Sequence, residues 1–360
     1  MPRKSARKRV LVLRAGSPST NNLIRSLRAG DPSCVIVGCH HDGFELKKSL
    51  ADRNFLVRAS PRRELARALH QIVELERIDI VIPNSEPDVA IVSDLRKALG
   101  CRTFVPGKSV LERCRDKYAL TTFLRERGLP VPETYPVLST RDIPRVFRRL
   151  PPASRLWCRI RRGSGSVGAI PVETPAQVRG WIHYWEQMRG IPRGSFTLSE
   201  FLPGRDLTVQ CLLRGGVPLM SKTHEKLSYH VLAGVPSGVS STASLAKIIH
   251  EPHALRVSIE AIRALDRDAS GVFFVDLKEN PYGEPRITEI NAGRFANVPT
   301  IHDAYGGDNM VHMYVRAAFG EAIETVDARA HEGDYVLRSL DMCPVVLRGA
   351  ELFDEIRDLR

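Results

Sequence analysis

The chain has 360 residues, 43% of them apolar and 26% charged, which is typical of a folded protein of two or three domains and excludes a largely disordered chain. It contains no run of 18 apolar residues and no apolar N-terminal segment, so we expect no transmembrane helix, no secretory signal and a cytoplasmic location. The net charge is +12, with five of the positive charges in the first nine residues. Seven cysteines without paired spacing indicate buried thiols in a reducing compartment.

Apolar runs and helical segments alternate between a basic tail, residues 1–9, and Gly107. Strands are predicted at Val10–Leu13, Cys34–Cys39, Ile78–Ile82 and Arg102–Val105. Helices are predicted from Leu23, after a loop at Ala15–Asn22, from Pro61 with Ser60 as N-cap, and up to Gly100. Strands that alternate with helices predict a parallel, doubly wound sheet, so residues 10–107 are expected to form a small α/β domain.

The pattern changes beyond Gly107. Ser109 and Glu112 match a capping box that opens a short helix, and a second helix is predicted from Asp116 to Gly128. The segments that follow are predicted as strands at Leu156–Arg161, Ala169–Val172, Ser195–Glu200, Leu207–Leu213 and Val217–Ser221, a helix at Pro252–Leu265, strands at Gly271–Lys278 and Pro285–Asn291, a helix at Asp308–Phe319 and strand character at Tyr335–Leu347. This second part is therefore expected to be α+β with antiparallel sheets.

Three glycines, Gly163, Gly165 and Gly168, match the pattern G-x-G-x-x-G, which alone is a weak signal. A dinucleotide site requires a helix directly after the loop, whereas a strand-like segment follows here, so a Rossmann site is disfavoured. A glycine-rich hairpin can instead fold over phosphates, because backbone N–H groups approach an anion closely where no Cβ intervenes. The alternative is an ordinary flexible hairpin tip.

Carboxylates gather on the predicted strand pair near the C-terminal end. Glu289 and Asn291 are two residues apart and point to one face. A hairpin centred between Tyr282 and Gly283 places Asp276 opposite Glu289 on that face, where two carboxylates repel unless a cation lies between them. Their oxygens are the ligands that Mg²⁺ prefers. The alternative is a solvated face neutralised by Lys278 or Arg286.

The order of several motifs resembles an ATP-grasp domain of the carbamoyl-phosphate-synthetase-like type over roughly residues 116–319. The matching stretches are RDKYALTTFLRERGLPVP, RIRRGSGSVG, LSEFLPGRDLTV and FFVDLKENPYGEPRITEINAGRF. The resemblance implies an ATP-grasp fold of two lobes at residues 108–325, with a hinge near residues 196–206. It implies a pre-ATP-grasp α/β domain at residues 10–107, and a strand and helix at residues 326–360 that complete the fold.

The resemblance also implies roles for individual residues. The ATP-binding positions are Lys117, Arg159, Gly163, Ser164, Gly165, Ser166, Gly168, Glu200, Phe201, Leu202 and Asp206. Metal ligands are Asp276, Glu289 and Asn291, and Arg159 and Arg294 are the catalytic arginines. Arg294 is displaced by one position, because the family often reads E-x-N-P-R where this chain reads E-I-N-A-G-R. Substrate binding is assigned to Lys222, His224, Lys226 and Arg294, and an ordinary polar loop is the alternative for the Lys222–Thr242 region.

A ligase that uses ATP and Mg²⁺, with Mn²⁺ as an alternative metal, follows from the resemblance. It would phosphorylate a small-molecule carboxylate to an acyl phosphate and couple it to an amine, giving ADP and phosphate. Two alternatives remain open: activation of bicarbonate, as in carbamoyl phosphate synthetase, and an inactive nucleotide-binding regulator. Nucleic-acid binding is disfavoured because no binding motif is present, no membrane partner is expected, and a homodimer is kept open.

Overall fold

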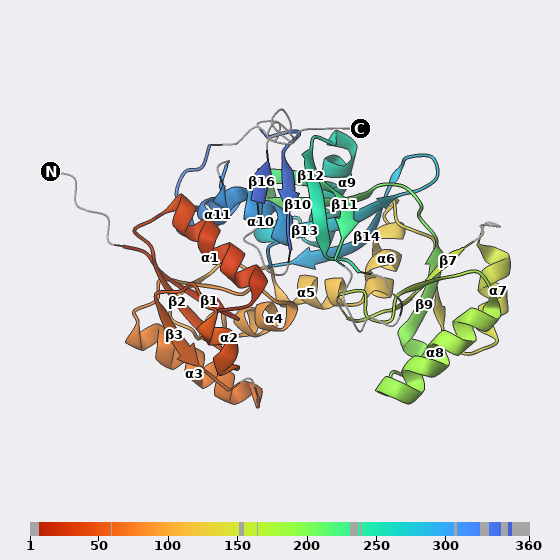
Figure 1. The fold of residues 1–360 in the computed structure, drawn as a ribbon, viewed down its shortest axis with the longest axis horizontal. Coiled ribbons are helices and arrows are strands. Elements are labelled where there is room, and N and C mark those ends of the chain that lie inside the picture. The colour runs from red at the N-terminus through yellow and green to blue at the C-terminus, as the bar shows by residue number, and fades with distance from the viewer. Residues whose placement is uncertain are drawn as a thin grey trace, which may run out of the picture.

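The computed structural model describes residues 7–58, 60–150, 155–163, 165–230, 237, 240–305, 308–324, 331–339 and 345–347. Three β-sheets follow one another along the longest axis of the molecule (Figure 1). A parallel sheet lies at the end nearest the N-terminus, a seven-stranded sheet lies in the middle, and a four-stranded sheet lies at the far end. Within the described residues, no helix is long and apolar enough to cross a membrane.

The parallel sheet has the strand order β3-β2-β1-β4-β5. Its strands are β1 (Arg9–Leu13), β2 (Val35–His40), β3 (Arg53–Leu56), β4 (Ile80–Ile82) and β5 (Arg102–Thr103). Its helices are α1 (Pro18–Gly30), α2 (Gly43–Lys47), α3 (Arg62–Leu75) and α4 (Glu86–Leu95). The predicted doubly wound α/β arrangement is therefore confirmed. Because β1 begins at Arg9, the last residue assigned to the basic tail belongs to the sheet.

Two predicted helix starts in this region are wrong. Helix α1 begins at Pro18, inside the expected loop, because Ser17 caps it and proline fits the first helical position. Helix α3 begins at Arg62, and Pro61, not Ser60, occupies its N-cap without any side-chain hydrogen bond. The N-cap of α3 therefore lies one residue after the predicted one, and the N-cap of α1 at Ser17 was not predicted.

Helices α5 (Lys108–Arg115) and α6 (Lys117–Arg125) connect the parallel sheet to the rest and pack against β14. The predicted capping box is wrong, because Gly107 is the N-cap of α5 and Ser109 lies within the helix. Asp116 caps α6 by accepting hydrogen bonds from the backbone N–H groups of Tyr118 and Ala119, both at 3.1 Å. This cap fixes the position of the next residue, Lys117.

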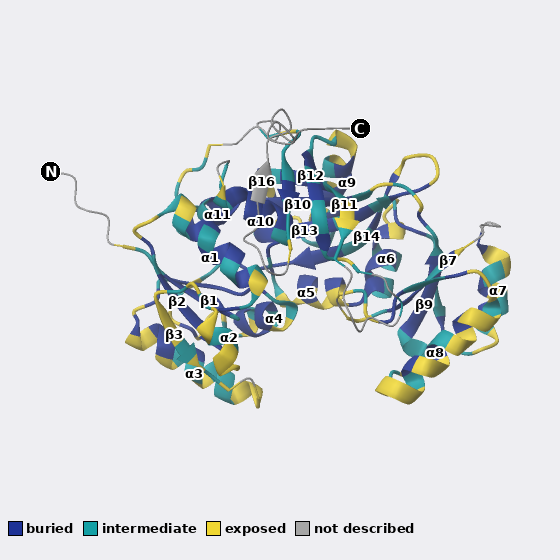
Figure 2. Ribbon diagram, viewed as in Figure 1, coloured by how far each residue is buried: buried dark blue, intermediate teal, exposed yellow. Residues whose placement is uncertain are grey.

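The four-stranded sheet has the order β6-β9-β7-β8 and carries its own apolar core (Figure 2). Its strands are β6 (Thr134–Val137), β7 (Leu156–Ile160), β8 (Ile170–Val172) and β9 (Phe196–Glu200), covered by α7 (Asp142–Arg149) and α8 (Pro175–Arg189), with a single 3₁₀ turn, η1 (Arg193–Ser195), before β9. Phe196, Leu198 and Trp185 are buried between the strands and α8. This separate core makes the sheet a lobe of its own.

The seven-stranded sheet has the order β14-β13-β10-β11-β12-β15-β16. Its strands are β10 (Asp206–Arg214), β11 (Val217–Tyr229), β12 (Ala243–Ile249), β13 (Gly271–Glu279), β14 (Pro285–Ala292), β15 (Tyr335–Leu337) and β16 (Val345–Leu347), and its helices are α9 (Pro252–Leu265), α10 (Asn297–Ala304) and α11 (Met310–Ala318). One apolar core continues from the parallel sheet into this one and includes Leu11, Val37, Val209 and Phe273. The predicted C-terminal helix lies outside the described residues.

Candidate active site

Two adjoining cavities, of about 380 and 460 Å³, lie between the four-stranded lobe and the seven-stranded sheet. Both are lined by Trp157, Arg159, Ser166, Lys226, Asp276 and Glu289. The smaller cavity also contains Lys117, the glycine loop, Asn291 and Arg294. The structure therefore brings together residues that lie more than 170 positions apart in the sequence, and the two cavities form one elongated site.

The glycine loop is the tip of a hairpin, because β7 and β8 pair antiparallel on either side of it. Gly163, Gly165 and Gly168 all have positive φ, at +145°, +66° and +72°. A Cβ on Gly168 would lie 2.2 Å from Ile160 Cδ1, and the Gly168 carbonyl accepts a hydrogen bond from Trp181. The predicted hairpin geometry is confirmed, and it excludes the strand–loop–helix arrangement of a Rossmann site. Ser164 lies outside the described residues.

Lys117 connects this loop to the carboxylates. Its Nζ donates to the carbonyl oxygen of Gly163 at 2.5 Å and lies 3.4 Å from Glu289 Oε2. The neighbouring Asp116 binds Arg161 through both carboxylate oxygens. A buried ammonium therefore joins the base of the glycine loop to Glu289 at the wall of the smaller cavity.

Arg159 on β7 is buried and only partly satisfied. Its Nη2 donates to the Thr288 carbonyl at 3.1 Å, whereas its Nε has no hydrogen-bond partner in the described part of the chain. Burial lowers the pKa of this guanidinium, and the negative charge of Glu289 opposes that shift. A buried donor without an acceptor is costly, which is the expected state of a residue whose acceptor is a ligand.

Asp276 and Glu289 are paired across β13 and β14, as the hairpin register predicted. Asp276 is engaged within the protein: Thr208 Oγ1 donates to it at 2.6 Å, Lys226 Nζ at 2.9 Å and Asn291 Nδ2 at 3.3 Å. Glu289 has one ion pair and accepts no hydrogen bond within the described chain; its partner is Lys117. Lys226 and Lys117 thus neutralise the pair, not Lys278 or Arg286.

Asn291 and Arg294 also line the smaller cavity. Arg294 Nη2 donates to Asn291 Oδ1, and its guanidinium lies 4.8 Å from the centre of the Phe274 ring. Burial lowers the pKa of Arg294, opposed by the charges of Glu289 and Asp276. No acid forms an ion pair with Arg294 among the described residues, so its charge is available to an anionic ligand.

The donor set fits a hard divalent cation in part. Glu289 offers carboxylate oxygens that no hydrogen bond occupies in the described structure, whereas the amide oxygen of Asn291 lies in the same cavity but accepts a hydrogen bond from Arg294. Asp276 is less available, because both of its oxygens already accept hydrogen bonds. Glu289 is therefore the best-placed candidate ligand of the three.

The larger cavity has the properties of a pocket for a flat, partly apolar ligand. Trp157, Pro171, Phe201 and Leu202 supply apolar walls near the segment that connects β9 to β10. At its polar end, Asp206 accepts a hydrogen bond from the Tyr229 hydroxyl at 2.5 Å and lies 3.2 Å from Lys226 Nζ. Glu200 lines this cavity too, although its Oε1 is engaged by the backbone N–H of Glu133 at 3.1 Å.

His224 lines the smaller cavity but is poorly suited to carry a proton. It is 2% exposed, and its Nδ1 has no partner among the described residues. Burial, reinforced by Lys226 and opposed by Asp276, lowers the pKa of His224 to about 3. The imidazole is therefore neutral near pH 7, which favours a hydrogen-bonding role over the shuttling of a proton.

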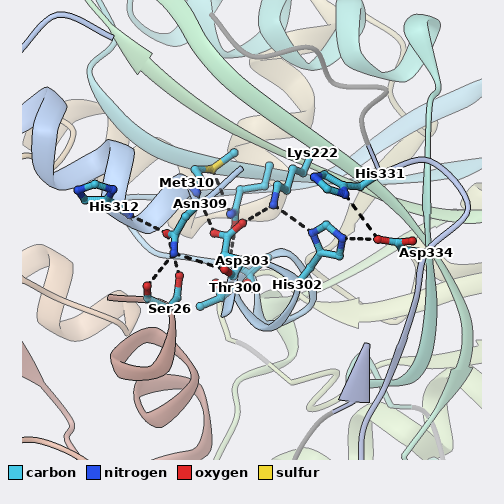
Figure 3. Close-up of polar contacts among 12 residues, drawn as sticks. Ser26, Lys222, Thr300, His302, Asp303, Asn309, Met310, His312, His331 and Asp334 are labelled. Atoms are coloured by element: carbon cyan, nitrogen blue, oxygen red, sulfur yellow. Dashed lines mark hydrogen bonds and ion pairs between the residues drawn. The ribbon is translucent and has the colours of Figure 1, made fainter. Parts of the chain in front are cut away.

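Lys222 lies elsewhere, in the polar cluster shown in Figure 3. Its Nζ is paired with Asp303 on α10 and lies 3.1 Å from Nδ1 of His302. Asn309 extends the cluster by donating to the backbone oxygen of Ser26 in α1 at 2.7 Å. The structure therefore places Lys222 in a buried tether between the central sheet and the parallel α/β part, outside both cavities.

Three residues beside this tether have the spacing of a metal triad, His302, His331 and Asp334. However, the ammonium of Lys222 donates to Nδ1 of His302, so the ring carries its proton on Nε2, which donates to Asp334 at 2.9 Å. A histidine that binds a metal through one ring nitrogen normally donates the N–H of the other nitrogen to an acceptor. If Nε2 of His302 bound a metal, Nδ1 would instead face a donor, the ammonium of Lys222. The hydrogen-bonded cluster is therefore the better interpretation.

Sequence reasoning missed Thr208, Trp157 and Tyr229. Thr208 lies opposite Asp276 in the pairing of β10 with β13, and these two residues are 68 positions apart in the sequence. Trp157 precedes the catalytic candidate Arg159 by two positions on β7. The alternation of strand side chains was the one available signal for it, because residues two apart share a face.

Comparison with known proteins shows similarity in structure alone. No family model and no curated protein sequence matches the chain. An L-amino acid ligase from Bacillus licheniformis has a TM-score of 0.67 at 13% identity, covering 91% of this chain and 78% of that one. A carboxyaminoimidazole ribonucleotide synthase from Aspergillus clavatus, complexed with ATP, has a TM-score of 0.68 at 16% identity, covering 92% and 81%. The biotin carboxylase domain of a 2-oxoglutarate carboxylase from Hydrogenobacter thermophilus, complexed with MgADP and bicarbonate, has a TM-score of 0.69 at 14% identity, covering 91% and 73%.

The chain has the ATP-grasp fold. In this fold the two cavities lie between the four-stranded lobe and the central sheet, under the glycine hairpin. The expected fold, an ATP-grasp fold preceded by a small parallel α/β domain, is thereby confirmed over most of the chain. The reaction is a separate question, because identities of 13 to 16% establish the fold and not the substrate.

Proposed function

We propose that this protein is an ATP-dependent ligase that phosphorylates a small-molecule carboxylate and couples the acyl phosphate to an amine. One observation supports this most strongly: Lys117, Arg159 and Arg294 converge on a single cavity with the carboxylate of Glu289, which is ion-paired with Lys117 alone among the described residues. That is a site for transferring a phosphoryl group, because three cations can stabilise the charge that develops on its oxygens. The adjoining apolar pocket fits the adenine ring of ATP.

The roles of the residues follow from their contacts. Lys117 and the N–H groups of the glycine hairpin would hold the phosphates, and Arg159 would donate a hydrogen bond from its unpaired Nε to the γ-phosphate. Arg294 would bind the substrate carboxylate in line with that phosphate, since orientation lowers the barrier to transfer. The hairpin would close over the phosphates and exclude water, which limits hydrolysis of the acyl phosphate.

Glu289 and Asn291 are the residues that would hold Mg²⁺, with Asp276 in support. When bound, that ion neutralises phosphate charge and polarises the phosphoryl oxygens. Asp206 and Tyr229 would meet the ribose hydroxyls at the polar end of the apolar pocket. The polypeptide at Glu200–Leu202 would meet the adenine edge through backbone groups.

Bicarbonate is the second candidate for the phosphorylated substrate. The observation that favours it is the likeness to a biotin carboxylase domain solved with MgADP and bicarbonate. Carboxyphosphate formation uses the same phosphate end of the site and also releases ADP, so the cavity itself fits both reactions.

A turnover screen against amino acids, small carboxylates and bicarbonate tests the proposal, with products identified by mass. We expect ADP and phosphate, transfer of one ¹⁸O atom from the labelled carboxylate into phosphate, and trapping of the acyl group by hydroxylamine when the amine is withheld. ATP turnover that depends on bicarbonate alone would select the second candidate. Formation of AMP, or nucleotide binding without turnover across the screen, would contradict both.

A further inference from the structure

A third cavity, of about 300 Å³, lies in the parallel α/β part of the molecule and shares no lining residue with the two cavities of the candidate active site. Its walls include Leu13 and Arg14 at the end of β1, Cys39 and His40 at the end of β2, and residues of α3 and α4. In the order β3-β2-β1-β4-β5 the connections diverge on either side of β1. Ligands of open α/β sheets bind in the crevice at this point of divergence, beyond the carboxyl ends of the strands.

Two arginines in the crevice are held in place by carboxylates and retain free donors. Arg14 Nε donates to Asp88 Oδ2 at 3.1 Å, and Arg115 Nε donates to Glu86 Oε1 at 2.6 Å. The terminal nitrogens of both guanidinium groups have no hydrogen-bond acceptor in the described part of the chain. A guanidinium fixed through Nε presents its remaining N–H groups as a fork that matches a phosphate or a carboxylate.

The backbone of Arg14 supports a functional role. Its φ is +58°, in the left-handed region that residues other than glycine rarely adopt. Residues retained in such conformations cluster at functional sites, where the conformation aims a side chain. In this conformation the Arg14 side chain contacts Asp88 in the first turn of α4.

The charge and the walls of the crevice define the chemistry of a ligand. Three arginines line it, Arg14, Arg62 and Arg115, and each is paired with one carboxylate, that of Asp88, Asp94 and Glu86 respectively, so the N–H groups left over by these pairs are what the crevice offers to an anion. The remaining walls are mainly apolar, from Leu13, Val57, Leu65, Pro87 and Ile91. The rings of His40 and His41 stack with centres 4.4 Å apart and add a flat surface.

We propose that this crevice is a second ligand site, which binds a small organic anion with a flat apolar body and a phosphate monoester or carboxylate group. The anionic group would lie on the free N–H groups of Arg14 and Arg115, with further N–H groups from Arg62, whose Nη2 is paired with Asp94. The apolar body would lie against Leu65, Ile91 and the stacked histidines. The site is distinct from the two cavities of the candidate active site, because it shares no lining residue with them. Arg115 also lines a narrow cavity that reaches Lys117 and Glu289, so the test is made with MgADP already bound.

Calorimetric titration of the full chain, saturated beforehand with MgADP, tests the proposal with three probes: phenyl phosphate, benzoate and inorganic phosphate. We expect one molecule of phenyl phosphate or benzoate to bind, about tenfold more tightly than inorganic phosphate, because the ring loses contact with water. Whichever organic probe binds more tightly identifies the anionic group. Arg14→Gln and Arg62→Ala should each weaken binding by about tenfold, the usual effect of losing one charge-assisted hydrogen bond or a nearby charge.

Arg28→Ala is the matched control, because Arg28 lies on the same part of the molecule, is similarly exposed and pairs with Asp52 at 2.6 Å outside the crevice. It should leave the affinity within about twofold, as expected for an exposed pair. If Arg14→Gln does not fold, the Arg62→Ala variant provides the test, because the Arg62 side chain is 59% exposed and its removal should not prevent folding. Loss of probe binding in the presence of MgADP, or wild-type affinity in the arginine variants, would overturn the proposal. Failure of the ligase assays would leave this result unaffected, because the readout is binding alone.

Discussion

Asp276 and Glu289 face each other across β13 and β14, and each carboxylate contacts a different lysine. Burial raises the pKa of Asp276, but Lys226 and the Thr208 hydroxyl outweigh it and hold that pKa below its usual range. Burial likewise lowers the pKa of Lys226, yet Asp276 and Asp206 raise it above its usual value. The two opposed carboxylates are thus unequal: Asp276 accepts hydrogen bonds from Thr208, Lys226 and Asn291, whereas Glu289 has an ion pair with Lys117 and can still contact a ligand.

This inequality predicts that Glu289→Gln impairs turnover more than nucleotide binding. The variant keeps the shape of the side chain and removes its charge, so turnover should fall by about 10²-fold or more, the usual effect of losing one electrostatic contact in the transition state. The measurement is ATP turnover with the substrate found by screening, beside the affinity for ATP. Glu284→Gln on the same hairpin, 57% exposed, is the control and should be neutral. Near-normal turnover in Glu289→Gln would contradict the assignment.

The register of this hairpin could be predicted in part, because the two strands are neighbours in the sequence. Side chains alternate along a strand, and a turn at Tyr282-Gly283 fixes which residues face each other. The observed pairs from Phe273 to Asp276 keep the predicted register, but nearer the turn a bulge shifts the pairing by one residue, so that Leu277 lies opposite Ile287. The pairing of Asp276 with Glu289 therefore depends on a bulge that the turn alone does not predict.

The partners of these residues could not be predicted in the same way. Lys222, His224 and Lys226 alternate along β11 and share a face, yet Lys226 lies at the cavity and Lys222 binds Asp303 in a buried cluster. What separates them is α10, which packs on β11 and follows it by some seventy residues. Long-range packing of this kind leaves no periodic signal in a single sequence.

Gly168→Ala is expected to destabilise the glycine hairpin. Alanine there would take a left-handed φ and place its Cβ against Ile160, so the free energy of unfolding should fall by about 1–3 kcal/mol. Gly180→Ala provides the opposite control, because Gly180 lies in the exposed interior of α8 with nothing near its Cβ position. That change should stabilise the protein by about 0.5–1 kcal/mol. Chemical denaturation of both variants measures the two changes in the free energy of unfolding. If both changes had the same sign, the steric explanation for Gly168 would be wrong.

Lys222→Met is expected to lower the free energy of unfolding by about 3–5 kcal/mol, because it leaves the buried carboxylate of Asp303 without its partner. Adding Asp303→Asn should restore part of the loss. Lys48→Met removes an exposed lysine paired with Glu45 and should change stability by less than about 1 kcal/mol. If Lys222→Met is as stable as the wild type and instead loses turnover, Lys222 binds substrate and the tether is wrong.

Burial of His224 is expected to make the folded protein less stable in acid. In the unfolded chain this histidine takes up a proton as the pH falls below about 6.5, whereas in the folded protein burial delays protonation until about pH 3. Between those values the unfolded state binds more protons, so stability is complete above pH 6.5 and declines as the pH falls. At 1.4 kcal/mol per pH unit, His224 alone should cost about 2 kcal/mol of stability between pH 7 and pH 5. His224→Gln should therefore show a shallower decline over this range by about that amount, measured by denaturation at each pH. His183→Gln removes an exposed histidine of α8 and should leave the wild-type slope. Parallel pH profiles for His224→Gln and the wild type would show that His224 is protonated in the folded protein.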